Sequence, residues 1–230
     1  MKNFIENNEI PRNTLIISCQ AEGDDPFNSP YGVSLFAKAA EMGGAGAIRS
    51  EGIAKTSMIL KKVNIPVIGL IKTKFPDKSV CITRNISEVE SLVQIGCKII
   101  SIDGTFRKKN HLSGPDFISF IKERFECSVI ADIATYQEAL ESHFAGADYI
   151  ATTLSGYTPD TRKNANQKPD FELVKTLVLN KIPRIIAEGR IKNYEQGKKM
   201  ILSGAWAIVI GTAITRPRLV IQNIVQKLNK

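Results

Sequence analysis

The sequence predicts a single (β/α)8 TIM barrel of the α/β class, and three observations support this fold. The chain has 230 residues, of which 43% are apolar, and this length suits one large barrel core. Gly44, Gly96, Gly146 and Gly204 each stand just before a β-branched run, at successive spacings of 52, 50 and 58 residues. Four further apolar runs fall between these, so eight strand candidates alternate with helical segments.

The strands are predicted as short runs rich in β-branched residues, which is typical of parallel strands buried on both faces. Four of them follow a glycine that ends the preceding helix, as short αβ turns require. In chain order, the runs are residues 14–18, 44–48, 66–71, 96–100, 128–131, 146–150, 184–187 and 204–208.

The helices are predicted from apolar positions three and four residues apart, several of them preceded by Ser, Thr, Asp or Asn as a cap. They cover residues 31–42, 53–63, 87–95, 115–125, 136–145, 171–179, 193–202 and 217–228. A doubly wound sheet is the alternative fold, and the sequence disfavours it because no Gly-x-Gly-x-x-Gly motif opens a helix.

The chain is predicted to hold one domain, at residues 14–230, preceded by a polar N-terminal extension at 1–13. We expect a cytoplasmic protein without a membrane partner, since neither a secretory signal nor an apolar run of roughly 20 residues is visible. Four cysteines, Cys19, Cys81, Cys97 and Cys127, are too widely spaced for a metal knuckle, and we expect reduced thiols.

The net charge of +8 raises the question of nucleic-acid binding. The Lys and Arg residues are scattered along helices and loops, whereas a nucleic-acid site gathers them in one stripe. We therefore expect no nucleic-acid partner, and interpret the charge as a solvated basic surface or an attraction for a small anionic substrate.

Long loops follow four predicted strands, at residues 20–30, 73–86, 104–114 and 153–169, whereas the segments before strands are short. Long loops without structure of their own are usually functional. In a barrel the active site lies at the C-terminal strand ends, which is where these loops are predicted to gather.

Polar side chains stand at the predicted strand exits and would form a ring around a small polar substrate. Each one alone is more often an ordinary polar cap. In chain order the ring consists of Gln20, Arg49, Lys72, Asp103, Asp132, Thr152, Thr153, Glu188 and Gly211-Thr212.

Lys72 and Glu188 end two runs of similar shape, residues 64–72 and 181–189, with opposite charges. A lysine that is partly desolvated near cationic Arg49 is disfavoured as ammonium, which suits it to proton abstraction. Glu188 would then move a proton at another substrate face. The alternative for Lys72 is a salt bridge to Asp132 or Glu188, and Asp132 could also orient the lysine or bind hydroxyls.

A phosphate site is predicted from Gly189 and from Gly211, Thr212 and Arg216, which follow the last two strands. Phosphate in barrels is often held by backbone N–H groups of these two loops. Arg216 would add a charge-assisted contact. The alternative is that the glycines serve tight turns and Arg216 is solvated.

Metal and cofactor chemistry is not expected. His111 and His143 fall in a loop and a predicted helix, away from the strand exits. Asp103, Asp132 and Glu188 could form a carboxylate site, but Lys72 would compete for their charge. The sequence thus favours acid–base catalysis without a cofactor.

Seven motifs together closely resemble the bacterial N-acetylmannosamine-6-phosphate 2-epimerase family, from about Thr14 to the C-terminus. They are Ile-Ser-Cys-Gln-Ala at 17–21, Gly-Ala-Ile-Arg at 46–49, Pro-Val-Ile-Gly-Leu-Ile-Lys at 66–72, Ala-Asp-Ile-Ala-Thr at 131–135, Asp-Tyr-Ile-Ala-Thr-Thr-Leu-Ser-Gly-Tyr-Thr at 148–158, Ile-Ala-Glu-Gly at 186–189 and Gly-Thr-Ala-Ile-Thr-Arg-Pro at 211–217. The chain departs from the family pattern at Gly104 and Ser155.

The resemblance implies a (β/α)8 epimerase that interconverts N-acetylmannosamine 6-phosphate and N-acetylglucosamine 6-phosphate in sialic acid and amino sugar breakdown. By motif, the catalytic pair falls on Lys72 and Glu188. The substrate contacts fall on Gln20, Arg49, Asp132 and Arg216.

Two other functions stay open at this point. Lys72 could form a Schiff base with a sugar phosphate, as in an aldolase-type lyase, or the ring could serve a non-catalytic sugar-phosphate sensor. We also expect a homodimer, because barrels of this kind often pair through their helices.

Overall fold

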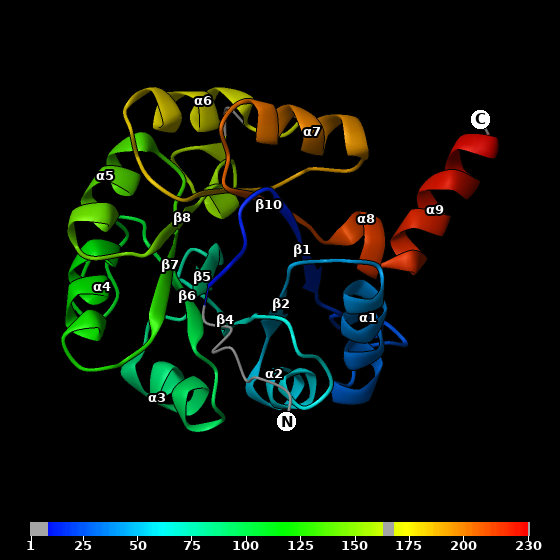
Figure 1. Ribbon diagram of the computed structural model, residues 1–230, viewed down its shortest axis with the longest axis horizontal. Helices are drawn as coiled ribbons and strands as arrows, with labels where there is room; N and C mark the ends of the chain where they lie inside the picture. Colours follow the sequence, from blue (N-terminus) through cyan, green and yellow to red (C-terminus); the bar gives the residue numbers. More distant parts are fainter. Residues whose placement is uncertain (1–8, 163–167, 230) are drawn as a thin grey trace.

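The computed structural model describes residues 9–162 and 168–229 and shows a closed parallel barrel surrounded by helices (Figure 1). The strand order around the barrel is β1-β10-β9-β8-β7-β6-β3-β2. The predicted (β/α)8 fold is confirmed. No helix in the described part of the chain is both long and apolar enough to cross a membrane.

The barrel strands match the eight predicted runs. They are β1 (Thr14–Cys19), β2 (Ala47–Glu51), β3 (Val67–Leu70), β6 (Ile99–Asp103), β7 (Ser128–Asp132), β8 (Tyr149–Ala151), β9 (Ile185–Glu188) and β10 (Ala207–Ile210). The helices are α1 (Pro30–Met42), α2 (Ile53–Leu60), α3 (Ile86–Gln94), α4 (Gly114–Lys122), α5 (Tyr136–Phe144), α6 (Phe171–Leu179), α7 (Tyr194–Leu202), α8 (Thr212–Thr215) and α9 (Pro217–Leu228), with a 3-10 turn η1 (Thr152–Leu154).

Side-chain caps fix where several helices begin. The Ser29 hydroxyl accepts a hydrogen bond from the Gly32 N–H at the start of α1. Thr135 and Glu138 form a reciprocal capping box on α5, which satisfies backbone N–H groups that have no partner within the helix. These caps set the helix starts close to the positions predicted from sequence.

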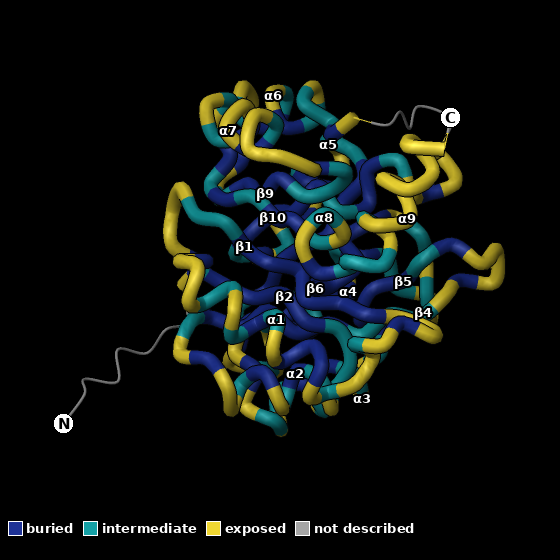
Figure 2. The backbone as a smooth tube through the Cα atoms, turned by 90° about the vertical axis from the view of Figure 1, so that its right-hand side faces the viewer, coloured by how far each residue is buried: buried dark blue, intermediate teal, exposed yellow. Residues whose placement is uncertain are grey.

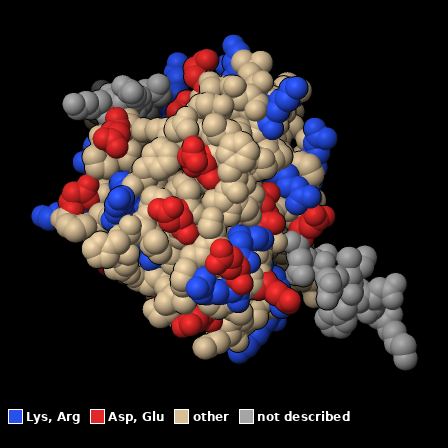
Figure 3. Space-filling model, turned by 90° about the vertical axis from the view of Figure 1, so that its left-hand side faces the viewer, with Lys and Arg blue, Asp and Glu red and all other residues tan. Residues whose placement is uncertain are grey.

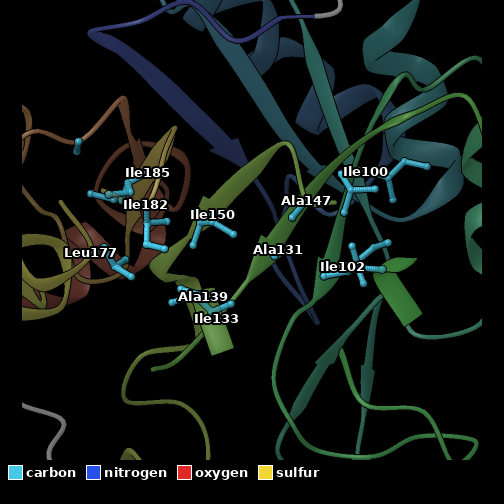
Figure 4. Packing of buried hydrophobic residues seen from close by; sticks show 14 of the residues in the cluster. Ile100, Ile102, Ala131, Ile133, Ala139, Ala147, Ile150, Leu177, Ile182 and Ile185 are labelled. Atoms are coloured by element: carbon cyan, nitrogen blue, oxygen red, sulfur yellow. The ribbon is translucent and has the colours of Figure 1, made fainter. Parts of the chain in front are cut away.

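Two apolar layers hold the barrel together. Inside it, alternate residues of the strands pack as one cluster that includes Ile16, Ile68, Ile130 and Tyr149. Outside it, the opposite faces of the strands pack against the helices, and Figure 4 shows part of this layer between β6, β7, β8 and the neighbouring helices. Figure 2 shows the strands as the buried centre of the molecule.

An antiparallel hairpin, β4 (Lys72–Lys74) and β5 (Val80–Ile82), occupies most of the segment predicted as the loop 73–86. The sequence analysis therefore missed this element. The hairpin's turn is exposed (Figure 2), whereas Cys81 and Ile82 are buried against the barrel end. Lys72 consequently belongs to the hairpin and lies beyond the last residue of β3, Leu70.

The short segment before β1 packs into the N-terminal end of the barrel. Ile10 is fully buried within the interior cluster. Its N–H donates to the Tyr149 hydroxyl, and its carbonyl accepts from the Trp206 Nε1–H. The division into an extension at 1–13 and a barrel at 14–230 stays a prediction, but Ile10 is part of the barrel core.

Candidate active site

Three predicted site residues, Arg49, Asp132 and Glu188, lie on inward-facing positions of the strands. Ile16, Ala47, Ile130 and Ile186 belong to the interior cluster, and strand side chains alternate between faces with a period of two residues. Counting on by two from each places four polar side chains above the cluster, namely Ser18, Arg49, Asp132 and Glu188. The site therefore forms the polar layer above an apolar barrel interior.

Arg49 and Asp132 form the centre of this layer. Arg49 NH1 and NH2 donate to the two Asp132 carboxylate oxygens at 3.1 and 2.7 Å, and NH1 also donates to Ser101 Oγ at 2.8 Å. The Thr153 hydroxyl donates to the same Asp132 carboxylate. Arg49 was predicted to follow its strand, but it lies inside β2, because the strand continues to Glu51.

Glu188 is the last residue of β9, and its side chain is only 13% exposed. Its Oε2 lies 3.3 Å from Arg49 NH1, yet among the described residues this oxygen has no hydrogen-bond partner. Burial raises the pKa of Glu188 above its ordinary value, attraction by Arg49 opposes this rise, and repulsion by Asp132 adds to it. A carboxyl with a raised pKa is suited to carry a proton.

Lys72 reaches the same region from the hairpin. Its Nζ donates to Gln20 Oε1 in a short hydrogen bond and to Glu22 Oε1 at 2.8 Å. From the sequence, the charged neighbour of Lys72 was predicted to be Arg49, with a salt bridge to Asp132 or Glu188 as the alternative. The observed ion-pair partner is Glu22, a residue from the irregular loop after β1 that the sequence analysis did not single out.

A cavity of about 770 Å³ joins these groups at the C-terminal end of the barrel. Lys72 and Glu188 both line it, so an acid and a base approach one space from different strands. The other predicted residues on its wall are Gln20, Arg49, Thr153, Gly189, Gly211, Thr212 and Arg216. Asp132 is not among the residues that line the cavity; it is fully buried and holds Arg49 in place.

The predicted phosphate residues share one side of the cavity. Gly189 directly follows Glu188 and has a φ of +111°, a conformation that side chains rarely adopt. Thr212 begins α8, and Arg216 lies between α8 and α9. Arg216 NH2 is 3.1 Å from Glu22 Oε1, so the structure gives this arginine an acidic partner where sequence analysis weighed a solvated side chain.

Asp103 lies apart from the cavity. Its carboxylate accepts hydrogen bonds from the Thr105 N–H and hydroxyl and pairs with Arg107 NH2 at 2.8 Å. Burial raises the pKa of Asp103, and attraction by Arg107 opposes the rise. Thr152 also lies outside the cavity wall, where its hydroxyl donates to the Glu188 carbonyl. Neither of these two predicted ring members is among the residues that line the cavity, and of the two Thr152 contacts the backbone of Glu188.

Sequence reasoning missed Ser101 as well as Glu22. Ser101 is two residues before Asp103 on the inward face of β6, so the strand period of two could have identified it. Glu22 is two residues after Gln20 but outside any strand, and no periodic signal marks it.

Residues 33–230 match the family model described as "Putative N-acetylmannosamine-6-phosphate epimerase". The chain is 43% identical over 215 residues to a protein of Caldanaerobacter subterraneus subsp. tengcongensis that carries the name N-acetylmannosamine-6-phosphate 2-epimerase with the qualifier "Putative". This alignment covers 93% of the chain and 90% of that protein. A Clostridioides difficile protein of the same name is 39% identical over 93% of the chain and 95% of its own length.

Solved structures agree with these sequence matches. The N-acetylmannosamine-6-phosphate 2-epimerase from Clostridium perfringens superposes with a TM-score of 0.87 at 36% identity, and the match covers 94% of each chain. A thiamine phosphate pyrophosphorylase from Pyrococcus furiosus superposes with a TM-score of 0.59 at 15% identity over 91% of this chain and 89% of its own. The second likeness concerns the barrel fold alone.

Proposed function

The chain belongs to the N-acetylmannosamine-6-phosphate 2-epimerase family, and we propose that it interconverts N-acetylmannosamine 6-phosphate and N-acetylglucosamine 6-phosphate. One observation carries this proposal: Lys72 and Glu188 line the same cavity, and Arg216 lines it too. A base, an acid and an anion-binding cation are thus available to one sugar phosphate.

The two sugars differ only in the configuration at carbon 2. The proton there becomes acidic once the ring opens to an aldehyde at carbon 1, and we assign assistance of ring opening to Glu188, whose pKa is raised by burial. Lys72 as a neutral amine removes the carbon 2 proton, and the electron pair moves to the carbonyl oxygen at carbon 1 to give an enolate that carries the acetamido group on carbon 2. Return of one proton to the opposite face completes the exchange, so no proton is gained or lost overall.

The remaining predicted residues bind and orient the sugar. Gln20, Arg49 and Thr153 line the cavity beside the catalytic pair, and Asp132 acts through Arg49 because the cavity does not reach it. We place the phosphate at Arg216, Gly189, Gly211 and Thr212, which lie together on the wall. Charge-assisted bonds from a planar guanidinium suit a phosphate well.

We further propose that the enzyme works without a cofactor in the cytoplasm, in amino sugar and sialic acid breakdown. A sugar phosphate is charged and does not cross a membrane unaided, so its enzyme needs to share its compartment. We propose neither a nucleic-acid nor a membrane partner. On the face shown in Figure 3, acidic and basic side chains are interspersed, which suits a solvated surface better than a nucleic-acid stripe.

Direct conversion tests the proposal. Each 6-phosphate is supplied alone, and formation of the other is followed by chromatography; no conversion in either direction would refute the function. Running the reaction in deuterated water places deuterium at carbon 2 of the product. In a Schiff-base lyase, borohydride with substrate would trap an adduct on Lys72, whereas we expect the epimerase to stay unmodified.

A second copy of the chain is the partner that we propose for α9. This helix stands away from the ring in Figure 1, none of its described residues is buried, and its apolar side chains Ile221, Ile224 and Leu228 are exposed. Such a patch usually marks an interface, and a two-fold pairing covers it in both copies at once. Sedimentation should therefore give a dimer, and Ile221→Asp with Ile224→Asp should give a monomer.

A further inference from the structure

Glu22 forms ion pairs with Lys72 and Arg216, the two cations that the proposed reaction uses as base and phosphate ligand. Its Oε1 lies 2.8 Å from Lys72 Nζ and 3.1 Å from Arg216 NH2, so one carboxylate oxygen serves both. Hydrogen bonds and charge attraction from Lys72, followed by those from Arg216, outweigh partial burial and hold the pKa of Glu22 below its ordinary value. Glu22 is therefore an ionised carboxylate on the cavity wall.

We propose that in the unliganded protein the Glu22 carboxylate occupies the place of the substrate's phosphate. When the substrate binds, its phosphate displaces this carboxylate from Arg216 and Lys72. This inference rests on the proposed function, since it takes Arg216 as a phosphate ligand and Lys72 as the base. A carboxylate and a phosphate present the same kind of anionic oxygen to a guanidinium. In the unliganded protein, Glu22 thus neutralises Lys72 and Arg216 until a more negatively charged phosphate binds them.

Charge repulsion prevents the Glu22 carboxylate and a phosphate from binding Arg216 at the same time. A phosphate oxygen bound to Arg216 would lie within a few ångströms of Glu22 Oε1, because that oxygen already contacts the same guanidinium group. Two like charges this close repel each other, and the repulsion is several-fold stronger near a protein surface than in bulk water. The Glu22 side chain is 51% exposed and comes from a loop, so it can turn into solvent.

Displacement has a consequence for the base. Because the same oxygen holds Lys72, its departure removes the anion that pairs with the ammonium group. Lys72 then keeps Gln20 as its neutral hydrogen-bond partner. Phosphate binding and the release of the catalytic lysine are thereby linked through a single side chain, and a sugar without phosphate lacks the charge to make this exchange.

The same loop provides a matched control. Asp24 pairs with Arg218 at 2.8 Å, and the Asp24 side chain is exposed. This pair joins the loop to α9 as Glu22 joins it to Arg216, but neither Asp24 nor Arg218 lines the cavity. Asp24→Asn therefore removes one negative charge from the loop without freeing a cation inside the site.

Calorimetric titration with inorganic phosphate tests the proposal on the unliganded full chain, alongside KM and kcat for each 6-phosphate. Glu22 holds two partly exposed ion pairs, each worth little, and loss of both should let Glu22→Gln bind phosphate about two- to thirtyfold more tightly. The KM should fall by a similar factor, with kcat within about twofold of the parent. Asp24→Asn should match the parent in both measurements.

Glu22→Asp separates displacement from simple charge repulsion. It keeps the charge but shortens the side chain by one methylene, so it should bind phosphate more tightly than the parent. Phosphate binding that is unchanged or weaker in Glu22→Gln, or parent-like in Glu22→Asp, would overturn the proposal. If both Glu22 variants bind phosphate more tightly than the parent, yet the parent converts neither sugar, the proposed function fails. The displacement of Glu22 by phosphate is still supported in that case.

Discussion

The Arg49 guanidinium and the Asp132 carboxylate meet through two hydrogen bonds, of 2.7 and 3.1 Å, beside the cavity that Arg49 lines. Arg49 is 2% exposed and Asp132 is fully buried. Arg49 also reaches Glu188, at 3.3 Å. Asp132 thus neutralises and orients the cation that faces the acid.

Removing Asp132 should destabilise the fold strongly. Asp132→Ala leaves Arg49 with less compensating charge in a buried place, and breaking such a pair costs about 3 to 5 kcal/mol of unfolding free energy. Urea denaturation measures this loss. The exposed pair of Glu123 with Arg124 is the control: Glu123→Ala should cost under about 1 kcal/mol. Equal losses in the two variants would contradict the buried-pair argument.

Ile10 should contribute to stability as a core residue, although it precedes the first strand. It is fully buried and packs inside the barrel, so Ile10→Ala should lower the unfolding free energy by about 2 to 5 kcal/mol. Thermal and urea denaturation provide the measurement. Leu202→Ala, at a side chain that is 77% exposed, should change stability little. An unchanged unfolding free energy in Ile10→Ala would show that barrel stability does not depend on this side chain.

Arg107 should act as a positioning residue for Lys72. It pairs with Asp103 at 2.8 Å, donates to Ser79 Oγ and to the Val80 carbonyl, and lies 4.3 Å over the Phe75 ring. These contacts attach the hairpin to the end of β6. Arg107→Lys keeps the charge but loses the planar fork, so the hairpin that carries Lys72 should loosen.

Steady-state kinetics of Arg107→Lys should show a fall in kcat of about 10- to 100-fold, because small displacements of a catalytic group are costly. The KM for the 6-phosphate should change little, since Arg216 is untouched. Arg124 is the matched control, as it also stacks on a phenylalanine, Phe120, but on the outer surface. A change in KM alone, or an equal effect of Arg124→Lys, would argue against a positioning role.

Periodic features of the sequence predicted the fold and much of the site. Buried parallel strands are continuous apolar runs, so the eight strands and the residues at their exits could be located directly. Gln20, Arg49, Lys72, Thr153, Glu188 and Arg216 were all expected near one mouth, and all of them line the cavity. Helix ends differ by a few residues, because fraying and caps decide them locally.

Irregular features could not be predicted in the same way. Glu22 meets Arg216 only because the loop after β1 folds beside the start of α9, and no local pattern records that contact. Asp132 was predicted as a substrate ligand at a strand exit, and its pairing with Arg49, on a different strand, is likewise a long-range contact that no local pattern marks. The β4–β5 hairpin did carry a signal, since β-branched residues flank the turn at Pro76-Asp77.

Glu188→Gln should slow catalysis strongly and stabilise the fold. The loss of a positioned proton carrier should lower kcat by about 100- to 10,000-fold. Burial raises the pKa of Glu188 in the folded protein above the ordinary value of 4.5. Between the ordinary and the raised pKa the folded state binds more protons than the unfolded state, so the parent loses stability as pH rises through this window.

The stability difference between Glu188→Gln and the parent should therefore be small below pH 4.5 and grow as pH rises, because only the parent must bury an ionised carboxylate. Melting temperatures measured from pH 4 to pH 8 test this dependence. Glu90→Gln on the exposed face of α3 is the control, and it should follow the parent throughout. A variant less stable than the parent at pH 8 would show that the attraction of Glu188 to Arg49 outweighs the cost of its burial, and the acid role assigned to Glu188 would lose its physical basis.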